Sequence, residues 1–386
     1  MKIGILTLPL HTNYGGILQA YALQTVLERM GHEVEVYNID RKPRHLSFPK
    51  VVYVMLLRIV ASIKGNKRFS FYNINKEMDA HYTEFAIKTQ YTQKFVDKYI
   101  KSCYLKDYVR QIPETKVDCV VVGSDQIWDL GNGVTISGNV VNAYLPYLPS
   151  SVKRFSYAAS FGHDEWRYSS EQTAVAKEAI KLFTAVSVRE YSGAALCKKY
   201  FGVDAHVDID PTLLLTSEDY VRAIGIEHMN PSDGNMLVYV LDRTLEKDAI
   251  TDYIEQALNL KRFRVNSKAE DINAKNAPIE DCIQPSVEKW LRGFYDAKFI
   301  VTDSFHACIF SILFHKPFIA VGNKHRGLTR FLNLLSKFHL DNRFVETFEE
   351  VKAIDLKAVI DYDEIEKILS VERKVSTDYL SKNLSI

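Results

Sequence analysis

The sequence lacks features that are typical of several large classes of protein. Its five cysteines are scattered along the 386 residues with no CxxC pair, which argues against a disulfide framework or a zinc site. The formal net charge of +1 gives no electrostatic case for nucleic-acid binding. No apolar run reaches transmembrane length. We therefore expect a cytoplasmic protein with reduced thiols and no nucleic-acid partner.

A second absence is local. No acidic residue occurs between Asp40 and Glu77. The same interval holds nine basic residues around an apolar run at 51–63: Arg41, Lys42, Arg44, Lys50, Arg58, Lys64, Lys67, Arg68 and Lys76. A basic amphipathic segment can lie on an anionic membrane, which would bring residues 41–76 to the inner face of the cell membrane. The alternative is a helical insertion, residues 41–115, that packs on its own domain and solvates its charges.

The remainder of the chain alternates between apolar strands and amphipathic helices. In the first half, a tight Asn-Tyr-Gly-Gly turn at 13–16 separates a strand from a helix, as in a Rossmann βαβ unit without the GxGxxG signature. Helical patterns fill 75–110. Further strands are expected at 117–122, 154–160, 185–188, 236–241, 262–266, 298–302 and 318–321. This alternation predicts an α/β fold with two Rossmann-like domains, 1–208 and 209–386, whose parallel sheets face each other across a cleft.

The block at 302–306, Thr-Asp-Ser-Phe-His, ends an apolar strand and precedes an apolar helical run. Asp303 or Ser304 can cap that helix, which places His306 in its first turn, beside free backbone N–H groups. A titratable donor at the carboxyl end of a strand lies where open α/β sheets bind anionic ligands. A polar residue in a satisfied structural environment is the alternative for His306.

Basic residues recur at this structural position. Arg189 follows a strand in the first half, and Lys324 and Arg326 follow another in the second half. If the carboxyl edges of both sheets meet at the cleft, these side chains and His306 would surround one anion. Taken singly, each could instead be a surface ion pair or a solvated loop residue.

A short acidic motif is the one feature that suggests a metal site. Asp208-Ile209-Asp210 matches the loose DxD spacing that holds a divalent metal in one class of glycosyltransferases. Pro211 follows directly, at the expected junction of the two domains, and we interpret the match as fortuitous. No other group of Asp, Glu and His suggests a metal, so neither a metal nor a cofactor is expected.

Taken in order, several blocks resemble the polysaccharide pyruvyl transferase family. They lie at 13–24 (NYGGILQAYALQ), 122–128 (VGSDQIW), 157–162 (YAASFG), 187–190 (SVRE), 210–214 (DPTLL) and 302–306 (TDSFH). The resemblance implies a GT-B-like fold and transfer of pyruvate from phosphoenolpyruvate to a sugar as a cyclic ketal, with release of phosphate. The acceptor would be a sugar of a polysaccharide or of its lipid-linked precursor.

The resemblance also implies roles for individual residues. An arginine at the position of Arg189 and a histidine at that of His306 engage the donor in this family, whereas Ser304 stands where characterised members carry an arginine. We expect the catalytic residues to be His306 as general acid or phosphate ligand, Arg189 as carboxylate ligand and Asp125 as base. The expected donor-binding residues are Arg189, Ser304, His306, Lys324 and Arg326. The expected acceptor-binding residues are Asn13, Tyr14, Gly15, Gln126 and His163.

Two other functions fit the same sequence. A GT-B glycosyltransferase that uses a nucleotide sugar would need the same basic cleft. A non-catalytic glycan-binding protein would account for Ser304 and for the basic segment, and it would release no phosphate.

Overall fold

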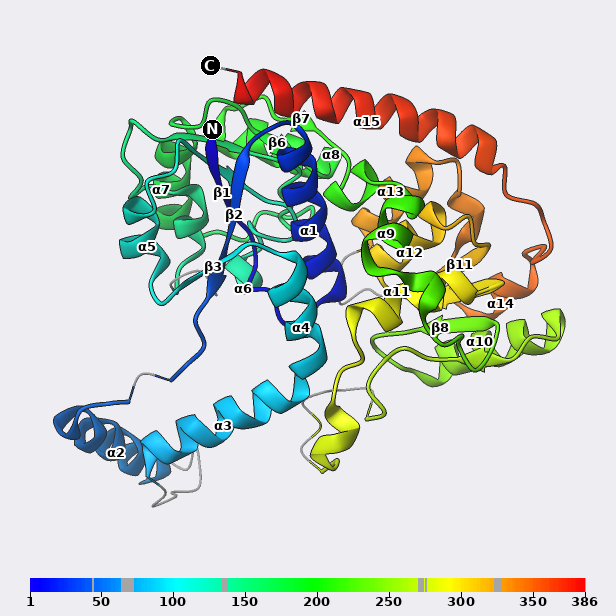
Figure 1. Cartoon of the computed structure of the whole chain (residues 1–386), viewed down its shortest axis with the longest axis horizontal. Helices are drawn as coiled ribbons and strands as arrows, with labels where there is room; N and C mark the ends of the chain where they lie inside the picture. The colour runs from blue at the N-terminus through cyan, green and yellow to red at the C-terminus, as the bar shows by residue number, and fades with distance from the viewer. Residues whose placement is uncertain are drawn as a thin grey trace. The chain divides into compact units, whose positions relative to one another are not determined.

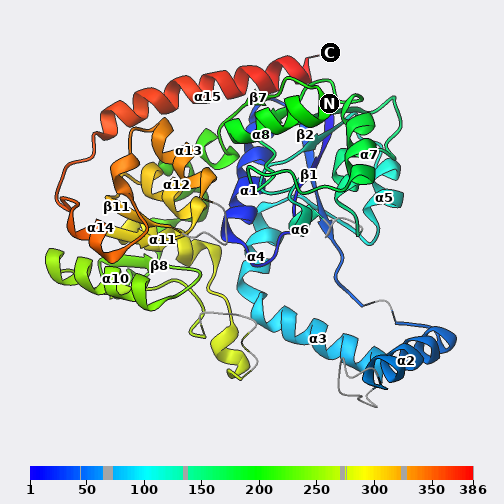
Figure 2. The same ribbon diagram turned by 180° about the vertical axis from the view of Figure 1, so that it is seen from behind.

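The computed structural model describes residues 1–43, 45–63, 73–133, 138–269, 274, 276–322 and 328–385. The chain forms two compact units. The first, which we call the main unit, comprises residues 1–39, 91–266 and 285–386. The second, the insertion unit, comprises residues 40–90 and 267–284. Figure 1 and Figure 2 show the elements of both units.

The first half of the main unit is built on a parallel five-stranded sheet with the order β3-β2-β1-β4-β5. Its strands are β1 (Lys2–Leu6), β2 (Glu33–Ile39), β3 (Ser102–Leu105), β4 (Cys119–Val122) and β5 (Lys153–Ser156). The central strand pairs on both sides, with Ile3 opposite Val34 and Cys119. Every residue of β4 is buried, because helices cover both faces of such a sheet. A short parallel pair, β6 (Ser187–Val188) and β7 (His206–Val207), continues beside β5.

Helix α1 (Tyr14–Arg29) joins the two halves of the main unit. In both views it lies between the first sheet and the helices of the second half. Its first residue, Tyr14, stacks on Trp290 with ring centroids 5.5 Å apart. Further along, Tyr21 contacts Tyr220. The helix is therefore apolar on nearly all sides and almost wholly buried. The other helices of this half are α4 (Gln90–Tyr99), α5 (Tyr108–Gln111), α6 (Leu130–Gly133), α7 (Ser170–Ile180) and α8 (Tyr191–Leu196).

The second half of the main unit repeats this architecture. Its parallel sheet has the order β12-β11-β10-β8-β9. The strands are β8 (Met236–Tyr239), β9 (Arg262–Phe263), β10 (Phe299–Thr302), β11 (Phe318–Val321) and β12 (Phe344–Val345). The helices are α9 (Ser217–Ile224), α10 (Leu245–Leu258), α11 (Val287–Asp296), α12 (Phe305–Leu313), α13 (Thr329–Lys337) and α14 (Phe348–Lys352). The predicted fold class, two Rossmann-like domains with parallel sheets, is confirmed.

The last helix, α15 (Tyr362–Leu384), returns to the first half of the main unit. Tyr379 donates a hydrogen bond to the carbonyl of Ser156 at 2.9 Å, and Ser376 donates one to Asp208 at 2.8 Å. The sequence analysis assigned all of 209–386 to the second domain. The structure instead packs the end of this segment against the first sheet, because the apolar side of α15 is buried there.

The predicted helical insertion, 41–115, is too long at its carboxyl end. Residues 102–105 form β3, the edge strand beside β2, rather than helix. This four-residue strand is too short to produce a clear alternating pattern. The insertion unit also includes 267–284, a segment of the second half that the sequence analysis did not assign to it.

The longest elements of the insertion unit are two helices, α2 (Phe48–Ile63) and α3 (Ile74–Lys88). The side chain of Asn75 bonds to both backbone groups of Leu46, at 2.8 and 3.2 Å. Arg58 and Glu77 form an ion pair at 2.8 Å between the two helices. No helix among the described residues combines the length and apolarity needed to cross a bilayer.

Candidate active site

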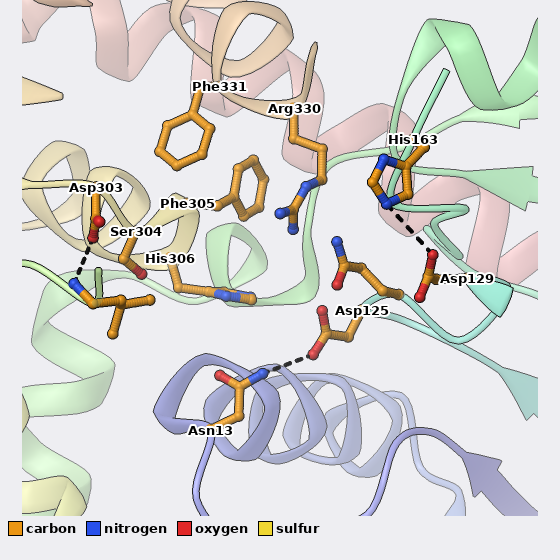
Figure 3. A pocket seen from close by; sticks show the side chains of 12 residues that line it. Asn13, Asp125, Asp129, His163, Asp303, Ser304, Phe305, His306, Arg330 and Phe331 are labelled. Atoms are coloured by element: carbon orange, nitrogen blue, oxygen red, sulfur yellow. Dashed lines mark hydrogen bonds and ion pairs between the residues drawn. The ribbon is translucent and has the colours of Figure 1, made fainter. Parts of the chain in front are cut away.

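A cavity of about 280 Å³ lies where the carboxyl edges of the two sheets meet in the main unit. Its walls come from loops after β1, β4 and β5 in the first half, and from loops and helices after β8, β10 and β11 in the second. Figure 3 shows the lining side chains. They are Asn13, Asp125, Gln126, Asp129, His163, Leu241, Asp303, Ser304, Phe305, His306, Arg330 and Phe331. In open α/β sheets this edge, where the strand order reverses, is the usual ligand site.

Asn13 and Asp125 lie on the cavity wall that the first half of the main unit forms. The Asn13 side-chain amide donates to Oδ2 of Asp125 at 3.1 Å, which ties the loop after β1 to the loop after β4. Asp125 has a φ of 58°, in the left-handed region that few non-glycine residues adopt. It is 3% exposed. The bond therefore fixes a carboxylate at the strand-order reversal of the first sheet, β2-β1-β4.

Asp303 orders the equivalent place in the second sheet. Its carboxylate accepts hydrogen bonds from the backbone N–H groups of Leu241, at 2.7 Å, and Asp242, at 3.1 Å. It also accepts one from Nζ of Lys247 at 2.6 Å. The Asp303 carboxylate therefore bonds to groups of the protein itself, and it joins the loop after β8 to the start of α12.

His306 lies in the first turn of α12, as predicted, with Ser304 at the N-cap position. The Ser304 side chain makes no capping bond, so it faces the cavity instead. In Figure 3 the His306 ring extends towards Asp125, below the Arg330 guanidinium. A methyl group at Gly15 would come within 2.1 Å of Nδ1 of His306. Gly15 therefore lets the amino end of α1 pack directly against the imidazole.

A buried charge cluster supports His306 from behind. Nε2 of His306 lies 3.5 Å from Oδ2 of Asp210, which also accepts a hydrogen bond from Nη1 of Arg189 at 2.7 Å. Burial opposes ionisation of Asp210, but His306 and Arg189 outweigh it and hold the pKa of that carboxyl well below its usual range. Burial likewise opposes the charge on Arg189. Glu190 and Asp210 overcome it and raise the pKa of the guanidinium above its usual value.

Arg189 therefore lies behind the cavity wall and does not line it. Its Nε bonds to Glu190 at 3.0 Å, and its guanidinium lies 4.5 Å from the centre of the Phe305 ring. Nη2 is buried without a hydrogen-bond partner in the described part of the chain. The geometry thus supports a different role from the predicted carboxylate ligand: Arg189 neutralises Asp210 and Glu190 beneath the site.

Arg330 is a cation of the cavity that the sequence analysis missed. It stands at the start of α13 and reaches the same ring, with its guanidinium 5.6 Å from the centre of Phe305. The available signal was its place shortly after the strand at 318–321, but the predicted cations after that strand were Lys324 and Arg326. Those two residues lie outside the described part of the chain, so their roles stay predictions.

The predicted acceptor residues divide into two groups. Asn13, Gln126 and His163 line the cavity together, with Nε2 of His163 lying 3.7 Å from Oδ1 of Asp129. Tyr14 and Gly15 do not line it, contrary to the prediction. The Tyr14 hydroxyl donates to the carbonyl of Pro285 at 2.7 Å, so this residue belongs to the packing between the two halves of the main unit.

The DxD spacing at 208–210 holds two buried carboxylates that bond to protein groups. Asp208 accepts hydrogen bonds from Ser187 and Ser376, and Asp210 pairs with Arg189 as described. Among the described residues, no three His, Cys, Asp or Glu side chains are grouped as metal ligands would be.

Comparisons with known proteins give one family match and several distant structural matches. The family model described as polysaccharide pyruvyl transferase matches residues 13–325, a range that includes the cavity residues named above except Arg330 and Phe331. No curated protein matches the chain. The UDP-GlcNAc 2-epimerase of Neisseria meningitidis is 11% identical, with a TM-score of 0.45, over 97% of this chain and 94% of that one. The ADP-heptose heptosyltransferase II of Escherichia coli is 10% identical, with a TM-score of 0.37, over 96% and 99%.

Proposed function

The chain belongs to the polysaccharide pyruvyl transferase family, and on this premise we propose that it transfers pyruvate from phosphoenolpyruvate to a glycan as a cyclic ketal, with release of phosphate. The observation that carries the proposal is the placement of His306, Arg330 and Asp125 on one cavity. An acid, a fixed cation and a carboxylate come from three different elements of the main unit. Phosphoenolpyruvate needs cations for its two acidic groups and a proton donor for its methylene carbon.

The donor would bind beside the amino end of α12. The first residues of this helix, Phe305 and His306, line the cavity, and the amino end of a helix favours phosphate and carboxylate. The guanidinium of Arg330 offers a planar pair of donors to one of these groups. Because Ser304 replaces the arginine expected two residues before His306, we assign the missing charge to Arg330.

The reaction would proceed in two steps. In the first, a sugar hydroxyl adds to C2 of phosphoenolpyruvate, C3 receives a proton from His306, and the hydroxyl proton passes to Asp125. In the second, the C2–O bond to phosphate breaks, a second hydroxyl of the same sugar bonds to C2 and gives its proton to His306, and Asp125 passes its proton to the departing phosphate. The products are the ketal, which now carries a methyl group, and inorganic phosphate. General acid and base groups of this kind each contribute about a hundredfold to ten-thousandfold.

Within this scheme Asp210 and Arg189 act indirectly. Asp210 faces Nε2 of His306 and holds the ring in place, while Arg189 balances the buried carboxylates. On the opposite wall, Asn13 orients Asp125, and Gln126 and His163 would contact the acceptor sugar. The acceptor would be a sugar of a polysaccharide or of its lipid-linked precursor.

Ligand-dependent thermal unfolding tests the donor without knowledge of the acceptor. We expect phosphoenolpyruvate to raise the unfolding temperature, whereas 2-phosphoglycerate, a matched control that lacks the enol, raises it less. With a glycan present, phosphate release and a pyruvylated product in the mass spectrum should follow. Protection by nucleotide sugars but not by phosphoenolpyruvate would indicate a glycosyltransferase. Binding of a glycan without phosphate release would indicate a non-catalytic binding protein.

A further inference from the structure

The insertion unit carries an apolar helix face that is turned towards solvent. The exposed apolar side chains of α2 are Phe48, Val52, Tyr53, Leu56, Leu57, Ile59 and Val60, with exposed fractions from 39% to 80%. A helix of a soluble domain normally presents charged residues on its exposed side. This helix does the opposite, and an apolar patch of this kind marks an interaction site.

The spacing of these residues shows that the patch is one continuous stripe. Positions 52, 53, 56, 57 and 60 follow one side of a helix. The residues on the other side are less exposed, and Arg58 on that side pairs with Glu77 of α3. Helix α3 contacts the side of α2 that carries Arg58. The stripe on the opposite side of α2 has no partner among the described residues of the insertion unit.

The charge around the stripe selects the partner. From 41 to 76 the sequence contains nine basic residues and no acidic one. Among those described, Lys50 lies in the first turn of α2 and is exposed, and Lys42 and Lys76 are further cations of the same unit. An apolar stripe on a helix that carries basic residues and no acidic one is complementary to a lipid surface that offers acyl chains below anionic headgroups. A second copy of the chain would bring the same positive charges together and be repelled.

We propose that the α2 face of the insertion unit binds anionic lipid bilayers, with the stripe 52, 53, 56, 57 and 60 at the level of the acyl chains. The neighbouring lysines contact the headgroups. This contact recruits the protein to a membrane, and it is independent of the reaction proposed above. Its test therefore needs neither donor nor acceptor.

The test is sedimentation of the full chain with vesicles of phosphatidylcholine alone or mixed with phosphatidylglycerol. We expect binding to the mixed vesicles that weakens as salt is raised, and little binding to phosphatidylcholine. Leu56→Asp combined with Leu57→Asp should abolish binding. Lys50→Glu should weaken it by more than about fivefold, since one basic residue near an anionic surface contributes about that factor. Val359→Asp is the matched control, because Val359 is 93% exposed outside the insertion unit.

A fluorescence reporter gives an independent readout. The three native tryptophans, Trp128, Trp166 and Trp290, all lie in the main unit. In a Tyr53→Trp variant we expect a blue shift of the new indole emission with anionic vesicles. The proposal is overturned if the wild type does not bind anionic vesicles, or if the double aspartate variant binds as well as the wild type. It is also overturned if the chain dimerises in solution and that variant makes it monomeric.

Discussion

Nε2 of His306 lies 3.5 Å from Oδ2 of Asp210, a carboxylate that Arg189 also contacts. His306 lies in α12, which follows β10 of the second sheet, whereas Asp210 and Arg189 follow the last strands of the first half. The proposed acid is therefore positioned by residues of the other half of the main unit. This arrangement couples the geometry of the site to the packing of the two halves.

Replacing Asp210 should damage both stability and activity. Asp210→Asn removes a buried charge that faces the Arg189 guanidinium and the His306 ring, and loss of one partner of a buried pair costs about 3 kcal/mol of unfolding free energy. Phosphate release should also fall, because the His306 ring loses its support. Urea unfolding and a phosphate assay measure the two effects. Asp378→Asn is the control: its pair with Lys374 is exposed and contributes little. Equal stability of the Asp210 and Asp378 variants would contradict this account.

The same carboxylate predicts a dependence of stability on acid. The pKa of Asp210 is lower in the folded protein than its value of 3.8 in the unfolded chain. Its stabilising contribution is therefore complete above the unfolded pKa and is lost as the pH falls below it towards the folded pKa. The difference in unfolding free energy between the wild type and Asp210→Asn should be constant near neutral pH and shrink below about pH 4. A difference that is unchanged down to acid pH would show that Asp210 is not ionised in the native protein.

Gly15 should tolerate no side chain. The methyl group of Gly15→Ala would come within 2.1 Å of Nδ1 of His306, so the ring or the start of α1 must move. Gly16→Ala is the matched control in the same helical turn, where the nearest atom, on Asn13, is 3.1 Å away. We expect a much larger loss of phosphate release for the Gly15 variant than for the Gly16 variant. The reverse order would place His306 elsewhere during the reaction.

Arg330 should determine the affinity for the donor. Arg330→Ala removes a guanidinium from the cavity wall, and loss of hydrogen bonds to a charged group should raise the KM for phosphoenolpyruvate by about tenfold to a hundredfold. Arg110→Ala serves as a control, since that side chain is 85% exposed on α5. Steady-state phosphate release provides the measurement. An unchanged KM would show that Arg330 does not supply the charge that is missing at Ser304.

The sequence predicts what is encoded locally and fails where distant segments meet. The apolar run at 117–122 and the helix start at Ser304 are visible in short windows, and the structure has a strand at Cys119–Val122 and a helix with Ser304 at its N-cap position. The strand at 102–105 is missed, because a four-residue edge strand has no distinctive pattern. Tyr14 looks like a site residue beside Asn13, but its ring is buried against Trp290, a contact between residues far apart in the sequence.

The site residues divide in the same way, into those that the local sequence identifies and those that depend on contacts between distant segments. His306 and Asp125 could be identified because each follows a strand at its carboxyl end. Arg189 also does, but two carboxylates neutralise it, and one of them, Asp210, is twenty-one residues away. Arg330 lies at the start of α13, the helix that follows β11, and so it is several residues away from the end of that strand. Which cation faces the cavity is decided by tertiary packing, which the local sequence does not contain.

The most direct test of the central claim is the rate of phosphate release from phosphoenolpyruvate in the presence of a glycan acceptor, compared between the wild type and His306→Gln. If His306 delivers the proton to the donor, the rate falls by about a hundredfold or more, while the glutamine variant stays folded at the assay temperature. A rate for His306→Gln close to that of the wild type would contradict the account.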